Sequence, residues 1–227
     1  MIDSLDFYNQ NAGRYAAVNH GSTDASVDLR AFIERLEPLI VPNRPLRVLD
    51  AGSGTGRDTL AMLALGFEVD AFDGSVAMAE QSTLLTGQTT RVMRFEALDL
   101  PAEHYDGIWA MASLLHVQRA DLPQALIDLG GSLREGGVLF ASFKYGTGER
   151  VDARDGRAFT DLDEDGVAQL LGGMTGWELM ETTLRQPPAH QTNQEPWFSF
   201  TVRRVGPVLA CEPGRKINSP RAKPFGA

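Results

Sequence analysis

Two aspartates enclose a run of glycines in residues 46–75, and these residue types suit a nucleotide ligand. Asp50 ends a short apolar run, glycines follow at 52, 54 and 56, and Asp73 ends a second apolar run. Glycines let a ligand lie against the main chain without Cβ clashes, and the helix expected next offers unpaired backbone N–H groups. An acid at the tip of the second strand can accept hydrogen bonds from both hydroxyls of a ribose. The stretch therefore predicts a nucleotide-binding unit of strand, glycine turn, helix and strand.

The spacing of the glycines separates classes of cofactor. A dinucleotide-binding turn has the pattern G-x-G-x-x-G, whereas here Arg57 stands where the third glycine would be. No Lys-Ser or Lys-Thr pair follows, which excludes a phosphate-binding P-loop. The pattern acid-x-G-x-G-x-G instead resembles motif I of the class I S-adenosylmethionine-dependent methyltransferases. An ordinary tight turn between a strand and a helix is the alternative.

The resemblance implies S-adenosylmethionine as the cofactor and assigns residues to it. The ribose is expected on Asp73, and the adenine amino group near Asp99 at the tip of a third strand. The expected cofactor-binding residues are Tyr15, Asp50, Gly52, Ser53, Gly54, Gly56, Asp58, Asp73, Gly74, Ser75, Met78, Leu98, Asp99 and Ala110. Plain core packing is the alternative for Met78, and a surface turn is the alternative for Asp99.

A second set of residues is expected to bind the methyl acceptor, beside the cofactor in the cleft. His116 is the candidate catalytic residue, as a base or as an orienting group, because histidine titrates near neutrality. A structural histidine bonded to a neighbouring loop is the alternative. The expected substrate-binding residues are Tyr8, Lys144, Tyr145, Arg150 and Arg157. Arginine can hold a carboxylate or phosphate through two parallel hydrogen bonds, but acids lie among these residues, so a salt-bridged lid is the alternative.

The elements that must position these groups alternate between helix and strand. Apolar residues at helical spacing predict helices over residues 26–40, 75–84, 122–133 and 161–172. Apolar runs predict strands at residues 46–49, 67–72, 91–95, 105–110 and 138–143, followed by an antiparallel pair at 177–184 and 197–205. Residues 144–160 are expected to form a loop that closes over the cleft together with the N-terminal segment. The resemblance implies an α/β fold: one Rossmann-like domain with a seven-stranded, mostly parallel sheet and a C-terminal antiparallel hairpin.

Two further motifs narrow the resemblance. Residues 114–117, Leu-Leu-His-Val, and residues 133–139, Leu-Arg-Glu-Gly-Gly-Val-Leu, resemble the type 11/12 group of methyltransferases, with Glu135 in place of the usual proline. Residues 56–58 add a distant resemblance to tellurite-resistance-type methyltransferases. The motifs of enzymes that methylate DNA and of metal-dependent catechol-type enzymes are absent. These features favour in-line methyl transfer to a small molecule and no DNA partner. A nicotinamide-dependent oxidoreductase and a non-catalytic cofactor- or partner-binding module are the alternatives.

Length and composition predict the domain organisation and the cellular compartment. A chain of 227 residues with 43% hydrophobic residues and a net charge of −9 suits one globular domain, expected over residues 1–205 with cap helices in 1–40. Residues 206–227 are basic and proline-rich, so we expect a disordered tail. No apolar run approaches the roughly 20 residues of a membrane span, and the polar start is unlike a secretory signal. Cys211 is the only cysteine and no Cys/His cluster suggests a metal, so we expect a cytoplasmic protein without metal. The oligomeric state is not predicted.

Overall fold

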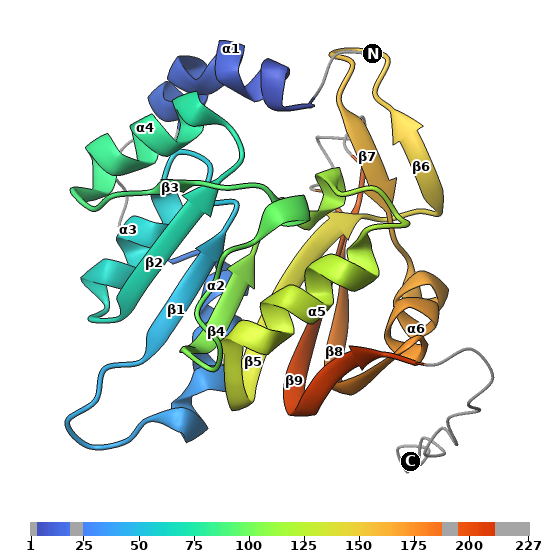
Figure 1. The fold of residues 1–227 in the computed structure, drawn as a ribbon. Coiled ribbons are helices and arrows are strands. Elements are labelled where there is room, and N and C mark those ends of the chain that lie inside the picture. Colours follow the sequence, from blue (N-terminus) through green and yellow to red (C-terminus); the bar gives the residue numbers. More distant parts are fainter. Residues whose placement is uncertain (1–3, 19–24, 188–194, 212–227) are drawn as a thin grey trace.

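The computed structural model describes residues 4–18, 25–187 and 195–211. Its centre is a seven-stranded sheet with the order β3-β2-β1-β4-β5-β9-β8 (Figure 1). Neighbours from β3 to β5 are parallel, whereas β9 runs antiparallel to both β5 and β8. The strands of this sheet are β1 (Arg47–Ala51), β2 (Glu68–Asp73), β3 (Arg91–Val92), β4 (Tyr105–Ala110), β5 (Leu133–Lys144), β8 (Met174–Arg185) and β9 (Trp197–Ala210). This arrangement confirms the predicted fold class.

Helices flank the sheet, and side-chain caps fix where three of them begin. The α-helices are α1 (Ser4–Val18), α2 (Val27–Leu36), α3 (Arg57–Ala64), α4 (Val76–Thr86), α5 (Leu122–Ser132) and α6 (Glu164–Gly172), with short 3-10 turns η1 (Glu37–Leu39), η2 (Phe95–Ala97) and η3 (Leu114–His116). Ser26, Ser75 and Asp163 each accept a hydrogen bond from the backbone N–H three residues later, at 2.8–3.2 Å. Such caps satisfy amides that have no partner inside the helix. Among the described residues, none of the helices combines the length and apolar character needed to cross a bilayer.

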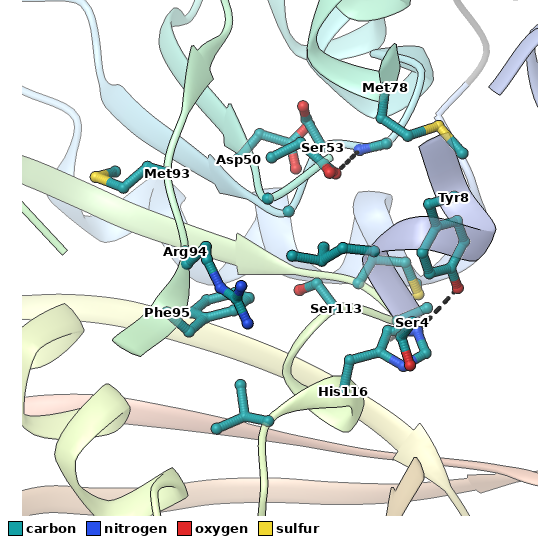
Figure 2. Close-up of a pocket in the computed structure, with 18 of the residues that line it drawn as sticks. Ser4, Tyr8, Asp50, Ser53, Met78, Met93, Arg94, Phe95, Ser113 and His116 are labelled. Carbon is teal, nitrogen blue, oxygen red and sulfur yellow. Dashed lines mark hydrogen bonds between the residues drawn. The ribbon is translucent and has the colours of Figure 1, made fainter. Parts of the chain in front are cut away.

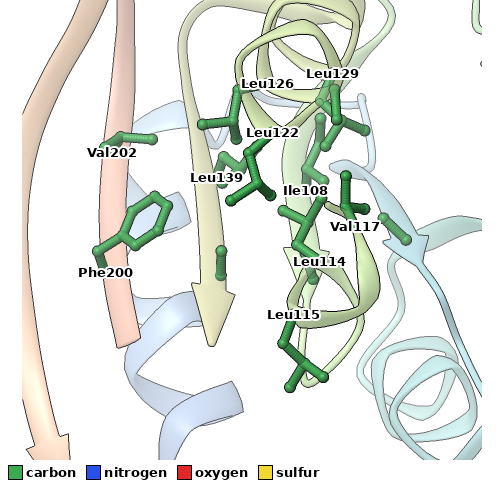
Figure 3. Packing of buried hydrophobic residues seen from close by; sticks show 14 of the residues in the cluster. Ile108, Leu114, Leu115, Val117, Leu122, Leu126, Leu129, Leu139, Phe200 and Val202 are labelled. Carbon is green, nitrogen blue, oxygen red and sulfur yellow. The ribbon is translucent and has the colours of Figure 1, made fainter. Parts of the chain in front are cut away.

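Two apolar clusters pack on opposite faces of the sheet. Neighbouring residues of β4 divide between them: Ile108 belongs to the cluster under α5, and Trp109 to the cluster under α2 and α3. Successive side chains of a strand point to opposite faces, which explains this division. Figure 3 shows the first cluster, where the α5 residues Leu122, Leu126 and Leu129 lie over the sheet. Each fully buried side chain of this kind contributes roughly 1.5–3 kcal/mol to folding.

The strand register brings the candidate site residues to one edge. Ala51 in β1 pairs with Phe72 in β2, and Asp50 pairs with Trp109 in β4. Strands β1, β2 and β4 are parallel, so their carboxyl ends meet at the same edge of the sheet. Ligands of open α/β sheets bind at this edge.

At the opposite edge, a buried carboxylate joins the amino ends of three strands. Asp106, the second residue of β4, accepts two hydrogen bonds from Arg44, at 2.6 and 3.0 Å. It also accepts one from Arg134 at 3.0 Å and one from the backbone N–H of Arg47 at 2.9 Å. Burial alone would raise its pKa, but these hydrogen bonds outweigh burial and hold the pKa of Asp106 below its ordinary value. The group ties β1, β4 and β5 together.

The third strand is shorter than predicted. Only Arg91 and Val92 pair with β2, and the chain then turns into η2. Met93 and Phe95 supplied the apolar pattern that predicted a strand over 91–95, but they pack inward instead of extending the edge of the sheet. The ring of Phe95 meets that of Phe72 edge to face at 5.2 Å. Burial of these two residues, and not sheet pairing, explains the pattern.

Two other boundaries also differ from the prediction. Residues 144–160 were expected to form a loop, but they contain β6 (Gly148–Val151) and the start of β7 (Ala158–Asp161), which form an antiparallel pair. Gly148 and Gly156, with φ of 83° and 78°, mark turns of this hairpin. The predicted domain boundary at residue 205 falls inside β9, which extends to Ala210 and pairs there with the start of β8. Residues 212–227 of the predicted tail lie outside the described residues.

Candidate active site

The glycine turn after β1 has a backbone that only glycine adopts readily. Gly52, Gly54 and Gly56 have φ of 81°, 57° and 86°. A Cβ on Gly52 would lie 2.4 Å from the Cβ of Ser113, so this position needs glycine for space as well. A Cβ on Gly54 would meet nothing within 4 Å. The turn is therefore packed against the protein at Gly52 and open at Gly54.

A cavity of about 590 Å³ lies at this edge of the sheet (Figure 2). Its volume falls within the range usual for small-molecule sites, roughly 300–1,000 Å³. Figure 2 shows Asp50 and Ser53 on one side and Tyr8, Ser113 and His116 on another. Sequence segments far apart in the chain supply the lining, because α1, the glycine turn, the end of β2, η2 and η3 all reach it.

One end of the cavity is acidic. Asp73 accepts hydrogen bonds from the backbone N–H groups of Gly54 and Ser75, both at 2.8 Å. Burial raises the pKa of Asp73 to about 6, despite these two hydrogen bonds. Asp50 accepts a 2.6 Å hydrogen bond from Thr59, and burial together with the charge of Asp58 raises the pKa of Asp50 to about 8. The structure shows an ion pair for neither Asp50 nor Asp73 among the described residues.

A third acid, Asp58, is paired instead. Arg57 donates to it through Nε and Nη2 at 2.8 and 3.0 Å, and the indole N–H of Trp109 donates at 2.9 Å. Asp58 thus ties the start of α3 to the buried centre of β4. The acidic end of the cavity therefore has two carboxyl groups without a cation and one that is neutralised by Arg57.

At the other end, a chain of hydrogen bonds joins α1 to η3 and β7. The hydroxyl of Tyr8 lies 2.8 Å from Nε2 of His116, and Nδ1 of His116 lies 2.9 Å from the carbonyl oxygen of Ala158. Arg157 donates from Nη1 to the Tyr8 hydroxyl at 2.9 Å. Burial, with the charge of Arg157, lowers the pKa of His116 to about 4, against the opposite effect of the bond to Ala158. His116 is therefore neutral at physiological pH.

Many of the residues expected at the cofactor do lie around the cavity. Those that line it are Tyr15, Asp50, Gly52, Ser53, Gly54, Asp58, Asp73, Gly74 and Met78. Gly56, Ser75 and Ala110 are not among the lining residues. A Cβ on Gly56 would clash with Ser82, and Ser75 caps α4 while donating to Asn9 of α1 at 2.7 Å. These two shape the turns beside the cavity without facing it.

Leu98 and Asp99 lie away from the cavity, because the third strand ends earlier than predicted. The side chain of Asp99 is 97% exposed and lies 3.4 Å from Arg91. Phe95 and Glu96 of η2 line the cavity in their place. The adenine role expected for Asp99 therefore has no geometric support. The acid that lines the cavity at η2 is Glu96.

Of the residues expected to bind the substrate, Tyr8 lines the cavity, as does the expected catalytic residue His116. Lys144 instead lies over the ring of Trp197 at 3.6 Å, and Tyr145 donates to Glu164 at 3.2 Å. Arg150 pairs with Asp161 and Glu195 at 2.5 and 2.6 Å. Lys144 ends β5, Tyr145 follows it and Arg150 lies in β6, and none of the three lines the cavity.

Several lining residues were missed by the sequence reasoning. They are Ser4, Leu5, Thr55, Arg57, Met93, Arg94, Phe95, Glu96, Met111, Ala112, Ser113, Val117, Gln118 and Ala158. Ser113 carries the clearest local role, since its hydroxyl donates to the carbonyl oxygen of Ala51 at 2.6 Å and it packs against Gly52. The positive φ of Ala112, 53°, turns the chain at this point. Only the nearness of Ser113 to His116 in sequence could have pointed to it.

Comparison with known proteins agrees with this site. Residues 48–137, from β1 to the start of β5, match the sequence model of the family described as methyltransferase domain. The matched segment, which contains the glycine turn and Asp73, is therefore similar to a methyltransferase domain. A solved 1,6-didemethyltoxoflavin-N1-methyltransferase of Burkholderia thailandensis, bound to 1,6-didemethyltoxoflavin and S-adenosylhomocysteine, shares its fold with a TM-score of 0.63. That protein is 22% identical, over 89% of this chain and 88% of its own.

Two curated relatives are similar in sequence. An uncharacterized methyltransferase of Geobacillus thermodenitrificans is 27% identical over 168 residues, which is 71% of this chain and 78% of that protein. Hemagglutinin 1 of Eikenella corrodens is 26% identical over 137 residues, or 59% of this chain. The match covers only 43% of the hemagglutinin, so the similarity reaches less than half of that relative's length.

Proposed function

We propose that this protein is an S-adenosylmethionine-dependent methyltransferase that acts on a small molecule. The observation that carries the proposal is the acidic end of the cavity, where Asp50 and Asp73 lie beside an open glycine turn without a cation. S-adenosylmethionine brings the missing positive charge, because its sulfonium and amino group are cationic. An electrically neutral or anionic nucleotide would leave these carboxyl groups uncompensated.

The residues present suit each part of such a cofactor. Asp73 can accept from the ribose hydroxyls, and the exposed backbone at Gly54 can lie against the ligand. The flat ring of Phe95 and the flexible side chains of Met78 and Met93 can enclose the adenine. Glu96 is the acid available to the adenine amino group. We therefore propose Glu96 in place of Asp99 for that contact.

Bound S-adenosylmethionine would supply an electrophilic methyl group for transfer to an acceptor atom, with the neutral thioether as leaving group. The protein's part in an in-line displacement is mainly to hold the two reactants in place, which alone lowers the barrier by several kcal/mol. Tyr8, His116 and Gln118 line the end of the cavity beyond the acids. We propose this end as the acceptor subsite. The cavity volume favours a small molecule.

Isothermal titration with S-adenosylmethionine, S-adenosylhomocysteine and NAD(H) tests the cofactor. Binding of the first two and not of NAD(H) is expected. Tight NAD(H) binding without a response to either of the others would favour a nicotinamide oxidoreductase instead.

Transfer of labelled methyl from the cofactor to a panel of small acceptors and cell extract tests the reaction. Labelled product that depends on intact protein is expected. Cofactor binding without transfer to any acceptor would point to a non-catalytic binding module. The cytoplasmic location and the single-domain organisation up to β9 stay predictions, which fractionation and limited proteolysis can check.

A further inference from the structure

Arg157 was expected to hold an anionic substrate, but its guanidinium is bound within the protein by Asp155 and Tyr8. It pairs with Asp155, donating from Nη2 at 2.8 Å and from Nε at 3.1 Å. Its Nη1 donates a hydrogen bond to the Tyr8 hydroxyl. The guanidinium also lies over the rings of Phe7 and Phe159, at 4.6 and 5.1 Å. Arg157 is therefore a fixed group behind the cavity wall.

The hydrogen bonds that join Arg157, Tyr8, His116 and Ala158 fix where each proton lies. Arginine only donates, so the Tyr8 oxygen accepts from Arg157 and directs its own proton to Nε2 of His116. The carbonyl of Ala158 only accepts, so Nδ1 of His116 carries the ring proton. The arrangement Arg157 to Tyr8 to His116 to Ala158 thus has one consistent proton order. It requires a neutral imidazole.

We propose that Arg157 is a positioning residue for methyl transfer: it holds the Tyr8 hydroxyl so that the tyrosine proton points to Nε2 of His116, which keeps the ring proton on Nδ1, and its charge adds to burial in favouring the neutral ring. The proposal rests on the proposed function for its role in catalysis. The acceptor subsite then presents a phenol and a neutral imidazole, and the charge of Arg157 stays behind them. The arrangement suits an acceptor that is uncharged at the reacting end, because among the described residues the guanidinium at this end, that of Arg157, is already paired with Asp155.

The titratable and charged groups that face His116 come from α1 and from the turn before β7. Tyr8 belongs to α1, and Arg157 and Asp155 belong to the turn that leads into β7; of these, Arg157 lowers the pKa of the imidazole and Asp155 raises it. Strand β5 also contacts η3, through the apolar cluster that contains Leu115 and Phe143. Loss of Arg157 would remove the opposing charge and leave Asp155 unpaired. Both changes favour the protonated imidazole.

The direct test is an NMR titration of the His116 ring in the free protein, which needs no methyl acceptor. In the wild type we expect an Nδ1–H tautomer that stays neutral down to a pKa of about 4. In Arg157→Gln we expect the midpoint to move upward but to stay below the ordinary value of about 6.5, because burial is the larger cause of the low pKa and remains in the variant. An unchanged midpoint in a folded Arg157→Gln protein would overturn the proposal.

Arg154→Gln is the matched control. Arg154 pairs with Asp152 two residues earlier, as Arg157 pairs with Asp155, and it lies in the same hairpin. It makes no contact with Tyr8 in the described structure, and its side chain is 70% exposed. The titration of His116 should be unchanged in this variant. An equal shift in both variants would mean that a general change of charge, and not position, is responsible.

Kinetics separate this proposal from the proposed function. With an acceptor in hand, Arg157→Gln should lower kcat by about tenfold, the usual effect of losing one charge-assisted hydrogen bond, and leave the KM for the cofactor nearly unchanged. In a Tyr8→Phe background the same substitution should lower kcat less than it does in the wild type, because the hydrogen bond from Arg157 to Tyr8 is already gone. Additive losses would overturn the role of Tyr8 as the link. If no methyl transfer is found at all, the proposed function fails while the titration result stands.

If Arg157→Gln does not fold, the wild type still answers the question. A slowly exchanging Tyr8 hydroxyl proton with a cross-peak to the His116 ring supports the proposed proton order. A ring that carries its proton on Nε2, or one that titrates near its ordinary pKa, would contradict it.

Discussion

Carboxyl groups at the two edges of the sheet have pKa values that are shifted in opposite directions. At the amino edge, Asp106 meets two arginines and a backbone N–H, and its pKa is lowered. At the carboxyl edge, Asp50 and Asp73 have only hydroxyl and amide donors, and their pKa values rise to about 8 and about 6. Burial raises the pKa in all three, and the two arginine partners of Asp106 distinguish it from the other two.

This difference in partners separates a carboxylate that stabilises the fold from two carboxyl groups that are available to a ligand. Asp106 is electrically satisfied by the protein itself and joins three strands. Asp50 and Asp73 cost folding energy in their charged form, because they lack a cation. A cationic ligand would relieve that cost, which suits the carboxyl edge to binding a cation. The following variants and conditions test this contrast.

The largest effect is expected for Asp106→Ala. It removes the partner of Arg44 and Arg134, whose side chains are about one third exposed and can regain some water. The free energy of unfolding should fall by roughly 2–3 kcal/mol, below the full penalty for a wholly buried pair. Chemical denaturation measures it. Glu178→Ala, which breaks an exposed pair with Arg203, is the control and should cost at most about 1 kcal/mol. Equal losses in the two variants would contradict the structural role of Asp106.

For Asp73→Ala the main loss should appear in binding. A hydrogen bond to a charged group is worth roughly 1.5–3 kcal/mol, so affinity for S-adenosylhomocysteine should fall at least about tenfold. Isothermal titration of the folded variant measures it. Asp99→Ala is the control, because its exposed side chain lies outside the cavity. If Asp99→Ala weakens binding as much, the placement of the adenine at η2 is wrong.

The two edges should respond to pH with opposite signs. Asp73 has a raised pKa, so its contribution to stability is present below about pH 3.8 and is lost as pH rises through about 6. Asp106 has a lowered pKa, so its contribution is present above its ordinary pKa and is lost as pH falls below it. Denaturation curves of the wild type and the Asp73→Asn and Asp106→Asn variants between pH 3 and 8 give each contribution by difference. Contributions of the same sign would refute the contrast.

Cofactor affinity should follow the ionisation of Asp73. If the ligand needs the carboxylate, affinity should rise by about tenfold between pH 5 and 7. The rise should be absent in Asp73→Asn. Titration calorimetry at several pH values measures it, and a flat profile in the wild type would show that the ionised acid is not required.

The smallest effect on stability is expected for Asp50→Asn. The amide keeps the shape of the carboxyl group, which is mostly protonated at pH 7 in the empty site, so the free energy of unfolding should change by less than about 1 kcal/mol. Binding of S-adenosylmethionine should release protons from the wild type, because a cation lowers the pKa of Asp50. Calorimetry in buffers of different ionisation enthalpy measures the release. The variant should release fewer protons than the wild type, and an equal release would remove Asp50 from the ligand's surroundings.

The acidic end was predictable because it is local in sequence. Asp50, the glycines and Asp73 lie within one strand–turn–helix–strand unit, where spacing fixes geometry. The adenine side was misplaced because Phe95 follows the end of a short edge strand, and apolar spacing does not tell an edge strand from residues that pack inward. Pairing between neighbouring strands decides that, and pairing is not visible in the local pattern.

The acceptor end could be predicted only in part. Tyr8 and Arg157 are 149 residues apart, and their contact depends on how α1 and the β6–β7 hairpin meet above η3. The sequence suggested that both segments approach the cleft. It could not show that the charge of Arg157 is already matched by Asp155, because that pairing depends on the turn of the hairpin.

Strand β9 has a consequence for how the chain is made. It lies between β5 and β8 although it is the last strand in the described sequence. On the ribosome, β1 to β5 can therefore assemble while β5 still presents an open edge, which is a site for wrong pairing with other chains. Phe200 and Val202 of β9 complete the apolar cluster on that side. Until residues 197–210 are made, this edge of β5 lacks the strand that pairs with it in the structure, and unpaired strand edges favour aggregation.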